Sequence, residues 1–135
     1  MRALFVNSRH SILVVDDDAA VCDIVRRSIQ REFAGAQIKV VNDGVEAVNE
    51  LDRQIDLIVL DLGLPQLRGE GVSLANELKG CNSPILIITG EPNPDLSYMG
   101  DINVMGLLKK PFDVDTLVKA VKTILNGEEY SPIPN

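Results

Sequence analysis

Three uninterrupted aliphatic runs limit the folds open to this chain more than any other feature of its sequence. They occupy residues 12–15, 57–60 and 85–88. Runs of this length suit β-strands, and strands that are apolar on both faces are typical of a parallel sheet covered on both sides. We therefore expect a buried parallel sheet.

Weaker strand candidates and helical patterns complete an alternating order. The strand candidates are residues 38–41 and 106–109. Apolar residues at helical spacing indicate helices after the first, second, third and fifth strands. These residues are Val21, Ile24, Val25 and Ile29; Val45, Val48 and Leu51; Val72, Leu74, Ala75 and Leu78; and Leu117, Val118, Val121, Ile124 and Leu125. Asp18 and Asp113 are the expected N-caps of the first and last helices.

The interval after the fourth strand differs from the others. Pro92 and Pro94 each restrict the residue before them, so a helix cannot begin at once. Gly100 then interrupts the rest of the interval. We expect at most a short helix between residues 95 and 103.

Five strands that alternate with helices predict an open, doubly wound α/β fold with helices on both faces of the sheet. We expect an N-terminal arm over residues 1–10, a domain over 11–126 and a tail or linker over 127–135. In such sheets, ligands bind beyond the carboxyl ends of the strands.

Length and charge exclude several classes of protein. The 135 residues fit one compact domain. A net charge of −7 argues against direct nucleic-acid binding. No apolar run reaches the roughly 18 residues that span a bilayer, and the start of the chain lacks a signal-peptide pattern. The sequence therefore predicts a cytoplasmic protein without a membrane partner.

Chemically capable side chains follow the carboxyl ends of four strands. They are Asp16, Asp17 and Asp18 after the first strand, Asp61 after the third, Thr89 after the fourth, and Lys109 and Lys110 after the fifth. Each alone could be an ordinary loop residue. Together, the carboxylates would suit Mg²⁺, and a nearby hydroxyl and ammonium could hold a phosphoryl group.

Four motifs in order, ILVVDDD, LIVLDLGLP, IITG and KKPF, lie between Ile12 and about Leu125. With them, the chain resembles the receiver domain of two-component response regulators. The resemblance implies a five-stranded (βα)5 flavodoxin-like sheet with strand order 2-1-3-4-5. It also implies Mg²⁺-dependent phosphoryl transfer from a sensor histidine kinase or a phosphotransfer protein, with slow autodephosphorylation in place of enzymatic turnover.

The resemblance also assigns roles to residues. Asp61 matches the phosphoacceptor and a metal ligand. Asp17 would bind Mg²⁺ directly, Asp16 would assist, often through water, and Gly63 would contribute its backbone carbonyl. The hydroxyl of Thr89 would follow the phosphoryl group.

Lys110 would pair with a phosphoryl oxygen, and the peptide bond to Pro111 is usually cis in the family. Leu107 stands where many receivers have an aromatic residue, and the proline-rich segment stands where they have a fourth helix. Both departures fall on the expected switch surface, residues 90–110. The output, a downstream protein target or a fused domain, is not encoded visibly.

Two alternatives remain at this point. Asp16-x-Asp18 after an apolar strand resembles the opening of aspartate-nucleophile phosphatases, but Ala20 stands where they have Thr or Val. That alternative leaves Asp61 and Lys110 unexplained. The other is a phosphorylation-independent interaction module, because a fold does not fix a function.

Overall fold

The computed structural model describes residues 9–51, 53–68 and 74–130. Five parallel strands form a sheet in the order β2-β1-β3-β4-β5. The strands are β1 (Ser11–Val15), β2 (Gln37–Val41), β3 (Leu57–Asp61), β4 (Ile85–Thr89) and β5 (Val104–Lys109). The α/β class and the strand order confirm the expectation from the sequence.

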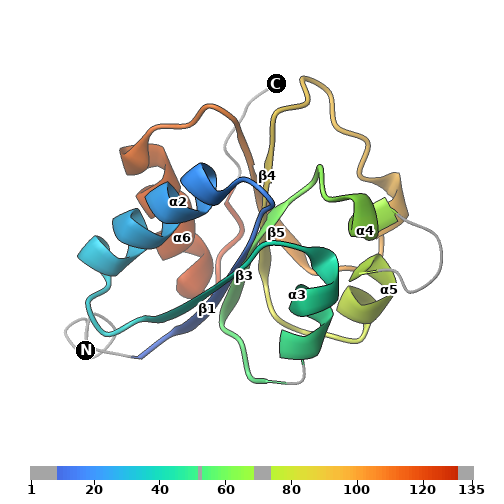
Figure 1. The fold of residues 1–135 in the computed structure, drawn as a ribbon. Helices are drawn as coiled ribbons and strands as arrows, with labels where there is room; N and C mark the ends of the chain where they lie inside the picture. The colour runs from blue at the N-terminus through green and yellow to red at the C-terminus, as the bar shows by residue number, and fades with distance from the viewer. Residues whose placement is uncertain (1–8, 52, 69–73, 131–135) are drawn as a thin grey trace.

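Helices cover both faces of this sheet (Figure 1). On one face, α2 (Ala19–Glu32) packs beside α6 (Val114–Leu125), and on the other lie α3 (Gly44–Glu50), α4 (Pro65–Arg68) and α5 (Leu74–Lys79). A 3-10 turn, η1 (Ser97–Met99), lies between β4 and β5. Among the described helices, none is long and apolar enough to cross a bilayer.

Alternate residues of each strand point into two apolar cores. In β1, Leu13 and Val15 pack into the core beneath α3 and α5, whereas Ile12 and Val14 pack into the core beneath α2 and α6. Every residue of the central strand β3 is buried. Burial on both faces explains why the sequence of β3 is uniformly apolar up to Asp61.

Side-chain caps fix where the two longest helices begin. The Asp18 carboxylate accepts hydrogen bonds from two backbone N–H groups in the first turn of α2. The Asp113 carboxylate accepts one from the backbone N–H of Thr116 at the start of α6. Gly127 follows α6 with a φ of 88°, a conformation that favours glycine. Both predicted caps are confirmed.

Several details differ from the sequence-based expectation. β5 begins at Val104, two residues early, and α4 was not predicted, although Pro65 suits a first helical position.

Ile24 is 50% exposed and Val45 is 64% exposed, so including these two residues in the apolar stripes of their helices was wrong. In α3, Gly44 and Ala47 face the core, and Val45 lies on the side that faces solvent. Val72 lies outside the described residues.

The segment between β4 and β5, residues 90–103, forms a strap along the edge of the domain. All of its residues are described, and η1 is its single helical element, which confirms that at most a short helix forms there. The strap does not hang free, because its apolar side chains pack against the core beneath α3 and α5. These side chains are Leu96, Tyr98, Met99 and Ile102.

The described part of the C-terminal tail packs on the edge strand β5. The backbone N–H of Tyr130 donates to the carbonyl of Met105 at 2.8 Å. A Cβ at Gly106 would lie 3.1 Å from the Tyr130 Cβ, so the glycine leaves room for this side chain. The described chain therefore stays in contact with the sheet as far as Tyr130. The domain end at residue 126 stays a prediction.

Candidate functional site

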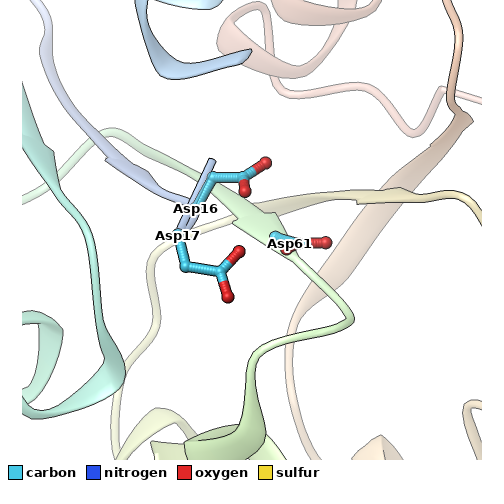
Figure 2. Close-up of side chains that lie close together, drawn as sticks. All are labelled: Asp16, Asp17 and Asp61. Atoms are coloured by element: carbon cyan, nitrogen blue, oxygen red, sulfur yellow. The ribbon is translucent and has the colours of Figure 1, made fainter. Parts of the chain in front are cut away.

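Carboxylates from two neighbouring strands meet at the carboxyl end of the sheet (Figure 2). Asp16 and Asp17 follow β1, and Asp61 ends β3; the parallel register, with Val15 opposite Leu60, places them side by side. Ligand oxygens of the three acids all lie within 4.8 Å of one another. Asp16 and Asp61 are buried and Asp17 is exposed. The structure thus brings together the acids that the sequence singled out.

Lys110 connects the two buried acids. Its ammonium nitrogen lies 3.0 Å from Asp16 Oδ2 and 3.5 Å from Asp61 Oδ1. The backbone holds the lysine at this position, because its N–H donates to the carbonyl of Thr89 at 2.7 Å. The following peptide bond, to Pro111, is cis, as the resemblance implied.

Burial and neighbouring charges both shift the pKa values of Asp16 and Lys110. Burial raises the pKa of the Asp16 carboxyl and the Asp61 charge adds to the effect, against hydrogen bonds from the Asp18 N–H and from Lys110. For Lys110, burial alone would lower the pKa, but the hydrogen bond to Asp16 and the charges of Asp16 and Asp61 raise it overall. Lys110 therefore stays protonated at neutral pH.

The residues at the site fit a divalent cation. Among the described residues, three carboxylates meet one ammonium here, that of Lys110, which leaves an excess of negative charge in a partly buried position. Like charges this close disfavour one another, and carboxylate oxygens are the ligands that Mg²⁺ prefers. Gly63 lies beside them, since its N–H donates to Asp61 Oδ1 at 3.1 Å. The metal-binding role of the Gly63 carbonyl stays a prediction.

Thr89 ends the strand between those of Asp61 and Lys110. Ile88, the residue before it, pairs with Asp61, and Thr89 itself pairs with Lys109. Its hydroxyl is buried at the rim of the site and accepts a hydrogen bond of 3.0 Å from the Glu91 N–H. The hydroxyl oxygen therefore joins the site to the first residues of the strap.

The two consecutive lysines point in different directions, as neighbours at a strand end should. Lys110 faces the acids, whereas the Lys109 ammonium donates to the carbonyl of Pro92 in the strap. Only Lys110 therefore belongs to the candidate site.

Two residues beside the site have no counterpart in the sequence-based prediction. The backbone carbonyl of Asp16 accepts from the Cys22 thiol at 3.2 Å and from Asn42 Nδ2 at 3.1 Å. Burial, followed by the charge of Asp16, raises the pKa of the Cys22 thiol to about 11. The thiol therefore keeps its proton at neutral pH. No sequence pattern marks either residue, because they approach from different elements.

Comparisons with known proteins agree on the family. The family model for the response regulator receiver domain matches residues 12–122. Response regulator MprA of Mycobacterium leprae (strain TN) is 35% identical over 116 residues, which cover 84% of this chain and 50% of that protein. MprA of Mycobacterium avium (strain 104) is 36% identical over 117 residues with the same coverage. The chain spans about half the length of these curated relatives.

Solved structures share the fold. Chemotaxis response regulator CheY4 of Vibrio cholerae is 26% identical with a TM-score of 0.67, over 85% of this chain and 98% of that one. The isolated REC domain of RcsB from Salmonella enterica serovar Typhimurium is 22% identical with a TM-score of 0.74, over 93% and 94%.

The family match does not favour an aspartate-nucleophile phosphatase or a phosphorylation-independent module. Neither alternative explains why the Lys110 ammonium lies 3.5 Å from the Asp61 carboxylate. A match over residues 12–122, on a sheet of order 2-1-3-4-5, is decisive. The chain belongs to the receiver domains of two-component response regulators.

Proposed function

We propose that Asp61 accepts a phosphoryl group in a Mg²⁺-dependent reaction, and that this changes the surface formed by residues 90–110. The position of the Lys110 ammonium supports this function most directly. It lies between Asp16 and Asp61, at 3.0 and 3.5 Å from their oxygens. From this position, the Lys110 ammonium can bind an oxygen of a phosphoryl group on Asp61 while it stays bonded to Asp16. Labelling with a small phosphodonor tests the proposal: Asp61 should gain one phosphoryl group when Mg²⁺ is present.

In the proposed reaction, an oxygen of the Asp61 carboxylate attacks phosphorus, and the bond between phosphorus and the donor breaks. The electron pair of that bond leaves with the donor group. The Gly63 N–H and Lys110 orient Asp61 Oδ1. Lys110 stabilises charge on the phosphoryl oxygens, and the Thr89 hydroxyl donates a hydrogen bond to one of them. When bound, Mg²⁺ would neutralise further charge on the same oxygens.

The metal should stabilise the free protein. We expect millimolar Mg²⁺ to raise the melting temperature in a saturable way, because a ligand of the folded state stabilises it by mass action, by about 2.7 kcal/mol at a hundredfold excess over Kd. Asp17→Ala should lose this response, because it removes an exposed carboxylate ligand without disturbing the core. Thermal melts with MgCl₂ or KCl at matched ionic strength provide the measurement.

The matched control for that experiment is Glu129→Ala, which removes an exposed acid in the tail, away from the site. It should respond to Mg²⁺ like the wild type. A wild-type melting temperature that does not change when Mg²⁺ is added would contradict the proposed metal site.

Phosphorylation should alter the strap. The strap follows Thr89 directly, and the Thr89 hydroxyl accepts a hydrogen bond from the Glu91 N–H. A shift of Thr89 toward a phosphoryl oxygen would strain this hydrogen bond. Leu107 of β5 and Tyr98 of the strap both pack against the core beneath α3 and α5, and the residue of β5 at that position is therefore aliphatic and not aromatic. We expect hydrogen exchange to change most between Gly90 and Gly106 on adding beryllofluoride with Mg²⁺. Unchanged exchange across this segment would show that the switch lies elsewhere.

Membership of the family implies a sensor kinase as the phosphodonor. Transfer through a separate phosphotransfer protein, a downstream target or fused output domain, slow autodephosphorylation and a cytoplasmic location stay predictions. So does the absence of direct nucleic-acid binding, which is supported by the net charge of −7.

A further inference from the structure

The backbone carbonyl of Asp16 is held by donors from two other elements. The Cys22 thiol, on the buried side of α2, donates to it at 3.2 Å, and Asn42 Nδ2, just after β2, donates at 3.1 Å. Asn42 Nδ2 also lies 3.8 Å from Cys22 Sγ. The two donors and the carbonyl therefore form one contact group, which ties the end of β1 to α2 and to the loop before α3.

This carbonyl belongs to the peptide bond between Asp16 and Asp17. Because a peptide unit is planar, fixing its oxygen also fixes the nitrogen of Asp17 and the point from which the Asp17 side chain departs. Asp16 itself is already anchored: its N–H donates to the Val41 carbonyl at 3.3 Å, and its carboxylate is bonded to Lys110. The Asp17 carboxylate is exposed, so its direction depends strongly on the backbone that carries it.

We infer that Cys22 and Asn42 are positioning residues for the metal site, which orient the Asp16–Asp17 peptide so that the Asp17 carboxylate faces Asp61. This role depends on the metal-dependent function proposed above. Neither residue is a metal ligand; each acts through the backbone of one. Groups that orient the ligands of a metal in this way typically change its affinity by about 10- to 100-fold when they are removed.

A purely structural role for Cys22 is the competing explanation, since its side chain is only 3% exposed. Two variants separate the explanations. Val25, on the same helix and in the same core, is fully buried, so Val25→Ala weakens packing without touching the Asp16 carbonyl. Cys22→Ser keeps a hydrogen-bond donor at the position, whereas Cys22→Ala removes it.

The experiment is a calorimetric titration of the full chain with MgCl₂, together with the melting temperature of each protein without metal. Asn42→Ala and Cys22→Ala should each bind Mg²⁺ about tenfold more weakly than the wild type. Cys22→Ser should bind within about twofold of the wild type, because the donor is retained. Val25→Ala should melt at a lower temperature and bind Mg²⁺ unchanged.

Several outcomes would overturn the inference. Wild-type affinity for Mg²⁺ in both Asn42→Ala and Cys22→Ala would show that the metal site does not depend on the hydrogen bonds to the Asp16 carbonyl. An equal loss in Val25→Ala would show that general loosening of α2 is the cause, and Cys22→Ser behaving like Cys22→Ala would show that the thiol does not act as a donor. If the wild type itself does not bind Mg²⁺, both the proposed function and the positioning role of Cys22 and Asn42 are wrong. If the wild type binds Mg²⁺ and the variants bind it equally well, only the positioning role is wrong.

Discussion

Asp61→Asn should abolish phosphorylation by acetyl phosphate in the presence of Mg²⁺. The asparagine amide has nearly the same shape as the carboxylate, but it lacks the negative charge and is not a comparable nucleophile. The replacement also keeps an acceptor for the Gly63 N–H, so the fold should survive. Intact-mass spectrometry of the full chain would measure the result: the wild type should gain the mass of one phosphoryl group, and the variant none.

The same strand offers a matched control. Asp56 lies just before β3, at the opposite end of the strand from Asp61, where its carboxylate accepts from the Ser11 N–H at 2.7 Å. Asp56→Asn makes the same chemical change and keeps an acceptor oxygen. It should be labelled like the wild type. Equal labelling of Asp61→Asn would place the acceptor on another residue.

Lys110→Ala should impair phosphorylation and also weaken the fold, whereas Lys109→Ala should leave phosphorylation unchanged. Removing the Lys110 ammonium leaves the buried Asp16 carboxylate without its charged partner, a loss of about 1–3 kcal/mol in the free energy of unfolding. It also removes the cation expected to bind the phosphoryl oxygens. Labelling by acetyl phosphate and denaturant unfolding would measure both effects.

Lys109→Ala is the control for this experiment, because it removes the same side chain one residue earlier. Its ammonium is exposed and donates to the Pro92 carbonyl, so its loss should affect the strap and leave the acids undisturbed. Equal losses of labelling in the two variants would mean that the directions assigned to the lysines are wrong.

The sequence could predict the strands and the acids because both depend on local patterns. A run such as residues 57–60 is apolar at every position, and its short length suits a strand buried on both faces. The position of Asp61 at the end of the run then places it at the carboxyl edge of the sheet. Once β1 and β3 are parallel neighbours, as in the strand order that the resemblance implies, Asp61 lies beside Asp16 and Asp17.

Other features escaped prediction because a helix is too short to show a pattern or because a contact joins residues of separate elements. The short helix α4 has four residues, too few to show a period. Val45 fits a helical stripe by spacing, yet α3 buries Gly44 and Ala47 instead, and Val45 faces solvent.

The two hydrogen bonds to the Asp16 carbonyl come from Cys22 and Asn42, which are 6 and 26 positions away from Asp16. The packing of Tyr130 on β5 likewise arises only once the sheet has formed.

The most direct test of the central claim is to map the phosphorylated residue in the wild-type chain. After reaction with acetyl phosphate, borohydride converts an aspartyl phosphate to homoserine, and digestion followed by mass spectrometry locates the change. We predict one modified residue, Asp61, only when Mg²⁺ is present during labelling. Modification at Asp16 or Asp17 in its place, or labelling of Asp61 that proceeds equally well with Mg²⁺ chelated, would contradict the claim.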